Sequence, residues 1–203
     1  MDKTHWYDGW FYDRIIAPNQ DRLFGHISNL IKAQSTIIDV GCGTGRFAFA
    51  LANRSKSVLG IDLSRRNVKR AQLNLLHRPN HKISFLHRSL SEIIREEHIY
   101  FDYAVLTYVI HEVDEEERIN LLNEVALVAD KIIIGDYLVP KSNGFAGKIS
   151  ETIEFLAGRE HYRNYKSYME KGGIYYLANN ARLKIINEQK YQSYNNHIVT
   201  LTK

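Results

Sequence analysis

Short apolar runs alternate with longer segments of helical periodicity between residues 36 and 137. The runs are strand-sized and rich in Ile, Val and Leu, as the buried strands of a parallel sheet are. The segments between them repeat apolar residues every three or four positions, as crossover helices do. This alternation predicts a parallel sheet with helices on its faces. The predicted strands are residues 36–40, 58–62, 83–86, 103–106 and 132–134.

Two local signals predict where helices begin. Ser64 precedes a segment that places Val68 and Ala71 on one face, so we expect Ser64 to cap that helix. Asp114 is followed three residues later by Glu117, a spacing typical of a capping box. The second signal predicts another helix, which would begin at Asp114.

The last third of the chain has a different pattern. Apolar spacing predicts helices around residues 149–156 and 174–181, with a Tyr-rich stretch between them. Two β-like runs, 183–191 and 197–201, close the chain, and the short connection between them permits only an antiparallel hairpin. The predicted fold class is α/β: a doubly wound, seven-stranded, mostly parallel sheet (Rossmann-like) with a final antiparallel hairpin.

Composition narrows the class of protein. The 203 residues are 44% hydrophobic and 25% charged, which is typical of a globular domain rather than a disordered chain. Cys42 is the single cysteine, which excludes a disulfide framework and a cysteine zinc site. His77 and His81 are four residues apart, but Pro79 breaks the helix that would align them, so we expect no metal site.

The sequence predicts neither a membrane segment nor secretion. No apolar run approaches the roughly 20 residues that a membrane-spanning helix needs. Residues 1–10 mix Asp, Lys and His with aromatic residues, unlike the apolar region of a signal peptide. The expected location is the cytoplasm, with no membrane partner.

A glycine cluster carries the candidate chemistry. The first predicted strand runs into Gly41, Gly43 and Gly45, and a predicted helix follows. Glycines permit a tight turn and a close approach of the backbone to a ligand. Asp62 ends the second strand 21 residues after Gly41, where a carboxylate can accept both hydroxyls of a ribose. The glycines and Asp62 together predict an adenosine-containing ligand at the carboxyl edge of the sheet.

The spacing of the glycines indicates which kind of adenosine ligand. Dinucleotide sites use Gly-x-Gly-x-x-Gly, whereas here the position of the last glycine holds Arg46. Asp39 places an anion beside the loop, which favours a ligand with a positive end over one that carries phosphates. A nicotinamide dehydrogenase is therefore disfavoured.

Four segments in order resemble one family. Residues 39–45 and 60–64 are similar to the first motif and the second strand end of class I S-adenosylmethionine-dependent methyltransferases. Residues 101–111 resemble their fourth-strand motif, and residues 132–136 resemble their fifth strand. The resemblance covers about half of the chain. It implies S-adenosylmethionine as the cofactor, with S-adenosylhomocysteine (SAH) as its product.

The resemblance implies a single methyltransferase domain over residues 1–203. Its expected parts are an N-terminal helical cover (1–33), a cofactor-binding core (34–137), a helical lid insertion (138–182) and a C-terminal hairpin (183–203).

The resemblance also implies which residues meet the cofactor. Asp62 would hold the ribose hydroxyls, Leu63 would flank the adenine and Thr107 would lie beneath the sulfonium. The family commonly has Asp near the adenine amine, where this chain has Ser89, which leaves adenine recognition to the Ser89 hydroxyl or the Leu90 backbone. The expected cofactor-binding residues are Asp39, Gly41, Cys42, Gly43, Gly45, Asp62, Leu63, Ser89, Leu90 and Thr107.

The acceptor side is expected after the fourth strand and in two aromatic segments. His111 is the candidate general base, and lining the pocket without catalysis is an equal alternative for His111 and Glu112. The aromatic segments, residues 6–13 and 159–165, are candidate covers of the pocket, with core packing as the alternative. The substrate-pocket candidates are Tyr7, Tyr12, Glu112, Arg159, His161 and Tyr162.

Charge is distributed unevenly along the chain. Residues 54–88 hold nine Lys or Arg and one Asp, whereas residues 92–124 hold ten Asp or Glu and two Arg. Such a basic run is usually a solvated helix face, and nucleic-acid binding is the alternative. The acidic segment belongs to the expected acceptor side and would repel a polyanion. The expected function is therefore methyl transfer to a small-molecule acceptor. The alternatives are an RNA or protein methyltransferase and a non-catalytic adenosine-binding regulator.

Overall fold

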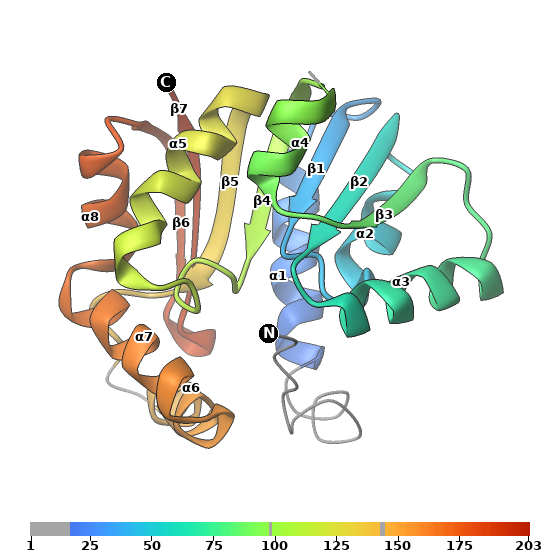
Figure 1. The fold of residues 1–203 in the computed structure, drawn as a ribbon. Helices are drawn as coiled ribbons and strands as arrows, with labels where there is room; N and C mark the ends of the chain where they lie inside the picture. Colours follow the sequence, from blue (N-terminus) through green and yellow to red (C-terminus); the bar gives the residue numbers. More distant parts are fainter. Residues whose placement is uncertain (1–16, 98, 143–144) are drawn as a thin grey trace.

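The computed structural model describes residues 17–203 except 98 and 143–144, and it forms one open sheet covered by helices (Figure 1). In chain order the elements are α1 (Ala17–Leu30), β1 (Thr36–Val40), α2 (Arg46–Leu51), β2 (Ser57–Asp62), α3 (Arg65–His77), β3 (Ile83–His87), α4 (Leu90–Glu97), β4 (Phe101–Thr107), η2 (Glu115–Glu117), α5 (Arg118–Val128), β5 (Ala129–Tyr137), α6 (Phe145–Ala157), α7 (Arg159–Glu170), α8 (Gly173–Asn180), β6 (Lys184–Tyr191), η3 (Gln192–Tyr194) and β7 (Asn196–Thr202).

The strand order across the sheet is β3-β2-β1-β4-β5-β7-β6. Strands β1 to β5 pair in parallel, and β7 pairs antiparallel with both β5 and β6. This arrangement confirms the predicted fold class, including the final antiparallel hairpin. The chain order reverses between β1 and β4, which is where open α/β sheets bind ligands at their carboxyl ends.

Helices cover both faces of the sheet (Figure 1). One buried cluster joins α1, α2 and α3 to the sheet, and a second joins α4, α5 and α8 to the opposite face. The sequence placed α8 in the lid insertion, but Ile174 and Leu177 of this helix are almost fully buried in the second cluster. Tyr165 and Tyr168 of α7 are equally buried in the same cluster, so both helices contribute to the core. The lid over residues 138–182 stays a prediction.

Helices α6 and α7 lie beside the carboxyl ends of β4 and β5 (Figure 1). The buried guanidinium of Arg118 fixes α7 there, because it donates to the carbonyl oxygen of Asn164 at 2.6 Å and to that of Val113 at 2.9 Å. The side-chain amide of Asn164 in turn donates to the carbonyl oxygen of Glu112 at 2.9 Å. These bonds hold α7 against the segment that follows β4.

One of the two predicted helix caps is confirmed. The Ser64 hydroxyl oxygen accepts from the backbone N–H of Asn67 at 3.3 Å and caps α3. The capping box at Asp114 and Glu117 is wrong: a 3-10 turn precedes α5, and the Asp114 carboxylate accepts from the side chain of Asn164 at 2.9 Å. The Asp114 carboxylate, which the local pattern assigned to the start of α5, is instead bonded to a side chain of α7.

Candidate functional site

The glycine loop joins β1 to α2 at the carboxyl edge of the sheet. The backbone N–H groups of Gly41 and Cys42 both donate to the carbonyl oxygen of Ile61, at 2.8 and 3.0 Å, which ties the loop to β2. Gly41, Gly43 and Gly45 all have left-handed backbone angles, with φ of 74°, 54° and 83°. The loop therefore needs glycine at each of the three positions.

The surroundings of the three glycines differ. A Cβ at Gly41 would lie 2.5 Å from a methyl carbon of Val109, and one at Gly45 would lie 2.4 Å from the ring of Phe85. A Cβ at Gly43 would meet nothing within 4 Å. Packing thus dictates glycine at Gly41 and Gly45, whereas the backbone at Gly43 borders open space that a ligand can fill.

Asp62 holds the middle of this loop. One carboxylate oxygen accepts from the N–H of Gly43 at 2.8 Å, and the other accepts from the N–H of Ser64 at 2.7 Å. Burial raises the pKa of Asp62, and these two hydrogen bonds work against that shift. The carboxylate is therefore positioned beside the open space at Gly43.

Asp39 is the most unusual carboxylate of the site. Its side chain is fully buried, and within the described ranges neither of its oxygens has a hydrogen-bond partner. Burial, and then the charge of Asp62, raise its pKa to about 7. A buried carboxylate without partners is costly to ionise, so a cationic group beside Asp39 would be stabilised.

The other predicted cofactor-binding residues near the loop are Cys42, Leu63 and Thr107. Cys42 is buried, and burial followed by the charges of Asp39 and Asp62 raises the pKa of its thiol, so the thiol stays protonated. Leu63 is 75% exposed and offers an apolar surface next to the loop. Thr107 ends β4, half-buried, in register with Gly135 of β5.

Ser89 caps α4. Its hydroxyl and its backbone N–H donate to one carboxylate oxygen of Glu92, at 2.9 and 2.7 Å, and the Glu92 N–H donates to the Ser89 hydroxyl at 3.2 Å. This is a capping box, and the spacing Ser89-x-x-Glu92 is visible in the sequence. Of the two groups left for adenine recognition, the hydroxyl is already engaged. The Leu90 side chain is buried in the core, so the Leu90 backbone is the group that remains.

His111 is enclosed by two carboxylates. Its Nδ1 lies 2.7 Å from a carboxylate oxygen of Asp136, and its Nε2 lies 3.5 Å from one of Glu154, with 1% of the side chain exposed. Burial alone would lower the pKa of His111, but the two carboxylates outweigh it and hold the pKa well above the ordinary value. The imidazole is thus held between two carboxylates, and the role of His111 as general base or as pocket lining stays a prediction.

The partners of His111 were not among the sequence candidates. Asp136 lies near the end of β5 and also accepts from the N–H of Tyr137 at 2.7 Å. Glu154 comes from α6 and accepts from the Tyr137 hydroxyl at 2.7 Å. A carboxylate at the end of a buried strand was the signal that singled out Asp62, and the same signal could have found Asp136. In the part of the chain that the structure describes, no group of His, Cys, Asp and Glu is placed to hold a metal ion.

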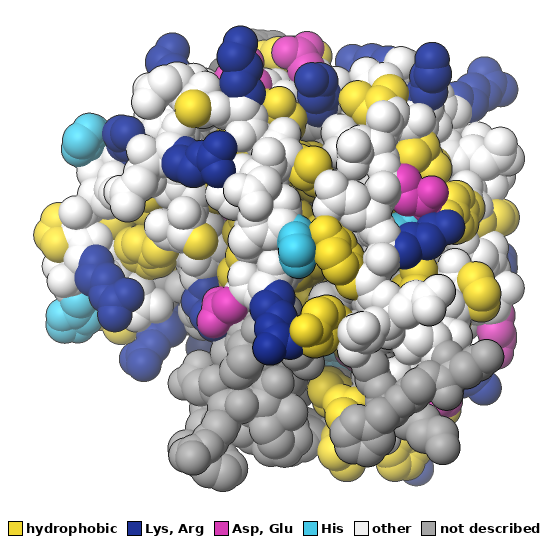
Figure 2. Space-filling view, turned by 180° about the vertical axis from the view of Figure 1, so that it is seen from behind, with side chains coloured by type: hydrophobic (Ala, Val, Ile, Leu, Met, Phe, Trp, Pro, Cys, Tyr) yellow, Lys and Arg dark blue, Asp and Glu magenta, His cyan; other side chains and the backbone are white. Residues whose placement is uncertain are grey.

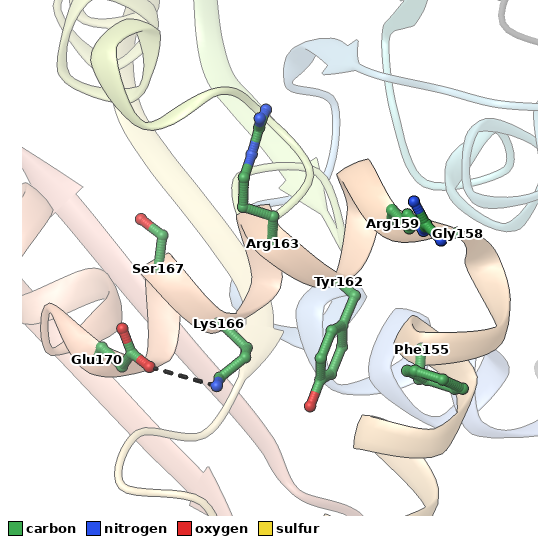
Figure 3. A pocket seen from close by; sticks show the side chains of 8 residues that line it. All are labelled: Phe155, Gly158, Arg159, Tyr162, Arg163, Lys166, Ser167 and Glu170. Atoms are coloured by element: carbon green, nitrogen blue, oxygen red, sulfur yellow. Dashed lines mark ion pairs between the residues drawn. The ribbon is translucent and has the colours of Figure 1, made fainter.

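The candidates on α7 lie on two faces of that helix. His161 faces the site, because its Nδ1 is 3.9 Å from a carboxylate oxygen of Glu112. Arg159 and Tyr162 instead line a groove of about 580 Å³ on the outer side of α7. In Figure 3 this groove runs from Phe155 to the ion pair of Lys166 with Glu170. The two aromatic candidates Tyr7 and Tyr12 lie outside the described residues.

Among the described helices, none combines the length and the apolar character needed to cross a bilayer.

A family model described as "Methyltransferase domain" matches residues 37–131. Among curated proteins, the ubiquinone biosynthesis O-methyltransferase of Nitrosomonas europaea is 32% identical over 95 residues, 47% of this chain and 38% of that protein. The 23S rRNA (uracil(1939)-C(5))-methyltransferase RlmD of Salmonella typhi is 28% identical over 67 residues, 33% of this chain and 16% of that protein. The matched part thus spans well under half the length of these curated relatives.

Among solved structures, the magnesium protoporphyrin IX methyltransferase (ChlM) of Synechocystis with bound SAH superposes with a TM-score of 0.66. The sequence identity is 18%, and the superposition covers 97% of this chain and 90% of that one. At this identity the similarity concerns the fold, and it extends over nearly the whole chain.

Proposed function

We propose that this chain, whose residues 37–131 form a class I S-adenosylmethionine-dependent methyltransferase domain, transfers a methyl group to a small-molecule acceptor. One observation carries the proposal: the fully buried, unpartnered carboxylate of Asp39 adjoins a glycine loop whose middle residue, Gly43, borders open space. The described residues thus offer a buried carboxylate four residues before a backbone position that borders open space, which suits a ligand with a positive end.

The residues at this edge fit S-adenosylmethionine. Asp39 would face its cationic end, Asp62 its ribose hydroxyls, and Leu63 and the Leu90 backbone its adenine. When bound, this cofactor supplies a methyl group that a sulfonium has already activated. The chain's own residues therefore need to bind, to orient the acceptor and to exclude water.

Calorimetry tests the choice of cofactor. SAH should bind with micromolar affinity, whereas NAD should bind negligibly, because the loop lacks the dinucleotide glycine spacing. Tighter binding of NAD than of SAH would refute the proposal. SAH binding without methyl transfer to any acceptor would instead favour the adenosine-binding regulator.

Asp62→Ala should weaken SAH binding by about 2–4 kcal/mol, because it removes charge-assisted bonds to two hydroxyls. That loss corresponds to a roughly 30- to 800-fold higher Kd in calorimetry.

Asp102→Ala is the matched control for Asp62→Ala. The Asp102 carboxylate also accepts from a backbone N–H, that of Thr36 at 2.7 Å, but both residues begin strands and so lie at the opposite edge of the sheet. This variant should lose stability and keep its affinity for SAH. An equal loss of affinity in both variants would mean that Asp62 acts through the stability of the fold alone.

The RNA methyltransferases among the relatives make nucleic acid the second candidate acceptor. Helix α3 exposes Arg65, Arg66, Lys69 and Arg70, which a polyanion could contact. On the face that Figure 2 shows, however, Lys and Arg side chains stand apart, with hydrophobic and uncharged side chains between them. Six of the ten acidic residues between 92 and 124 follow β4, so a polyanion would meet repulsion near the expected site of transfer.

Reversal of the α3 charges separates these two acceptor classes. Changing Arg65, Arg66, Lys69 and Arg70 to Glu should leave SAH affinity and turnover on the acceptor nearly unchanged, and should remove only weak, salt-sensitive binding of polyanions. Radiolabelled methyl transfer and a salt series of RNA binding measure the two effects. Loss of methylation with intact SAH binding would replace the small-molecule proposal with a nucleic-acid methyltransferase.

A further inference from the structure

Glu112 is the carboxylate of the site that has no strong cationic partner among the contacts described. It follows β4, and in the contacts described its nearest ionisable nitrogen is Nδ1 of His161 at 3.9 Å, a histidine that is charged only if protonated. The stronger pairs are made elsewhere: Asp136 and Glu154 share His111, and the Arg118 guanidinium donates to backbone carbonyls. Glu112 is therefore available to a ligand.

Glu112 is accessible and lies close to other ionisable groups. Of its side-chain surface, 42% is exposed, so a ligand can reach the carboxyl. Burial raises the pKa of Glu112 to about 7, the carboxylates of Glu154, Asp136 and Asp62 add to this shift, and the His111 cation opposes it.

The charges that face Glu112 come from five elements of the fold. They are Asp62 at the end of β2, His111 after β4, Asp136 in β5, Glu154 in α6 and His161 in α7. Carboxylates outnumber cations in this set. An anionic acceptor would be repelled here, and a cationic acceptor would be attracted.

The Tyr165 hydroxyl is a further polar group of this cluster. The Tyr165 hydroxyl is buried, has no hydrogen-bond partner within the described residues, and lies near enough to Glu154 and Asp136 for their charges to raise its pKa. Its ring packs edge-on against Tyr137 at 5.3 Å between centroids. An N–H donor would satisfy the hydroxyl oxygen.

We infer that the acceptor is an amine that arrives as its ammonium cation, and that Glu112 takes the proton from its nitrogen. This inference rests on the proposed function. The ammonium N–H bond breaks and its proton moves to a carboxylate oxygen of Glu112, which leaves the lone pair on nitrogen. That lone pair forms the new N–C bond to the methyl carbon, while the S–C bond breaks and its electron pair stays on sulfur.

The first experiment sorts acceptors by charge. A small-molecule extract of the organism that encodes the chain is divided by ion exchange at pH 7 into cationic, neutral and anionic pools. Each pool is incubated with the protein and methyl-labelled S-adenosylmethionine. Label should appear in the cationic pool. Label confined to the neutral or anionic pool would overturn the inference and leave methyl transfer intact. No label in any pool, with SAH binding intact in calorimetry, would refute the proposed function and the inference with it.

The second experiment changes Glu112. Glu112→Gln should lower kcat/KM on the labelled cationic acceptor by about 10²- to 10⁴-fold, the usual contribution of a positioned base. Glu112→Asp should recover at least part of it, because a carboxylate is restored. Glu116→Gln, an exposed neighbour in η2, is the control and should match the wild type. SAH affinity should be the same in all four proteins. A Glu112→Gln variant as active as the wild type would overturn the inference.

A third measurement needs no turnover. In the protein without cofactor, the carboxyl carbon of Glu112 should titrate near pH 7 in ¹³C NMR, and kcat/KM of the wild type should rise with pH through the same value. Titration of Glu112 near the ordinary pKa of a glutamate, about 4.3, would contradict the role as a base.

Discussion

Asp136→Ala is expected to destabilise the protein by about 3–5 kcal/mol, because it removes the closest partner of a buried cation. His111 is 1% exposed and lies 2.7 Å from the Asp136 carboxylate, whereas its other partner, Glu154, is 3.5 Å away. The variant also leaves the N–H of Tyr137 without its acceptor. Urea denaturation at pH 7 measures the free energy of unfolding.

Asp130→Ala is the matched control on the same strand. Asp130 is exposed, and its carboxylate accepts only an exposed hydrogen bond from the Tyr100 hydroxyl at 3.2 Å in the contacts described. Its loss should cost less than about 1 kcal/mol, as exposed polar contacts do. Similar losses in both variants would mean that the His111 cluster contributes nothing beyond an ordinary surface contact.

The same cluster makes stability depend on pH in two directions. The pKa of His111 is raised on folding, so its contribution is present below about pH 6.5 and is lost as pH rises through the higher folded value. Burial would raise the pKa of Glu154, but the His111 cation lowers it overall, so its contribution is lost as pH falls through that lowered value. Asp136→Ala should flatten the alkaline decline, which a pH series of urea titrations would detect.

The sheet was predictable because its evidence is local. A buried parallel strand such as β1 is recognisable as a mostly apolar run. The helix after β2 is predictable from Ser64, whose side chain caps it. The glycine loop was predictable for the same reason, since Gly41, Gly43 and Gly45 all lie within five consecutive residues.

The His111 cluster was not predictable because its parts lie far apart in sequence. Asp136 and Glu154 follow His111 by 25 and 43 residues, and only the fold brings their carboxylates to the imidazole. The sequence identifies His111 as a candidate, but no local pattern links it to these two carboxylates. The capping box went wrong in a similar way, because Asn164 of α7 reaches the Asp114 carboxylate.

The orientation of α7 about its own axis was not predictable from the spacing of its apolar residues. The sequence leaves this segment as a pocket cover or as core packing. His161 lies 3.9 Å from Glu112, Arg159 and Tyr162 line the outer groove, and Tyr165 and Tyr168 are buried in the core. A helix with aromatic residues on several sides has no single apolar stripe, so the sequence does not fix which face turns inward.

Gly45→Ala should destabilise the protein by about 2–5 kcal/mol, because it combines a left-handed residue with overpacking. Its φ is 83°, and the new Cβ would lie 2.4 Å from the tip of the buried Phe85 ring. The ring has no room to move toward β2. It already packs so closely against Gly60 of β2 that a Cβ at that glycine would lie 2.6 Å from the ring. Thermal or urea unfolding measures the loss.

Gly43→Ala is the control that separates the fold from the ligand. Gly43 has a φ of 54°, but a Cβ there meets nothing within 4 Å, so only the backbone cost of about 1–2 kcal/mol applies. Its methyl group would enter the open space, so SAH affinity in calorimetry should fall more than stability does. Adding Phe85→Leu should recover part of the stability that Gly45→Ala loses. It should recover none in the Gly43→Ala background, because of these two glycines only Gly45 contacts that ring. Equal recovery in both backgrounds would contradict the packing of Phe85 against Gly45.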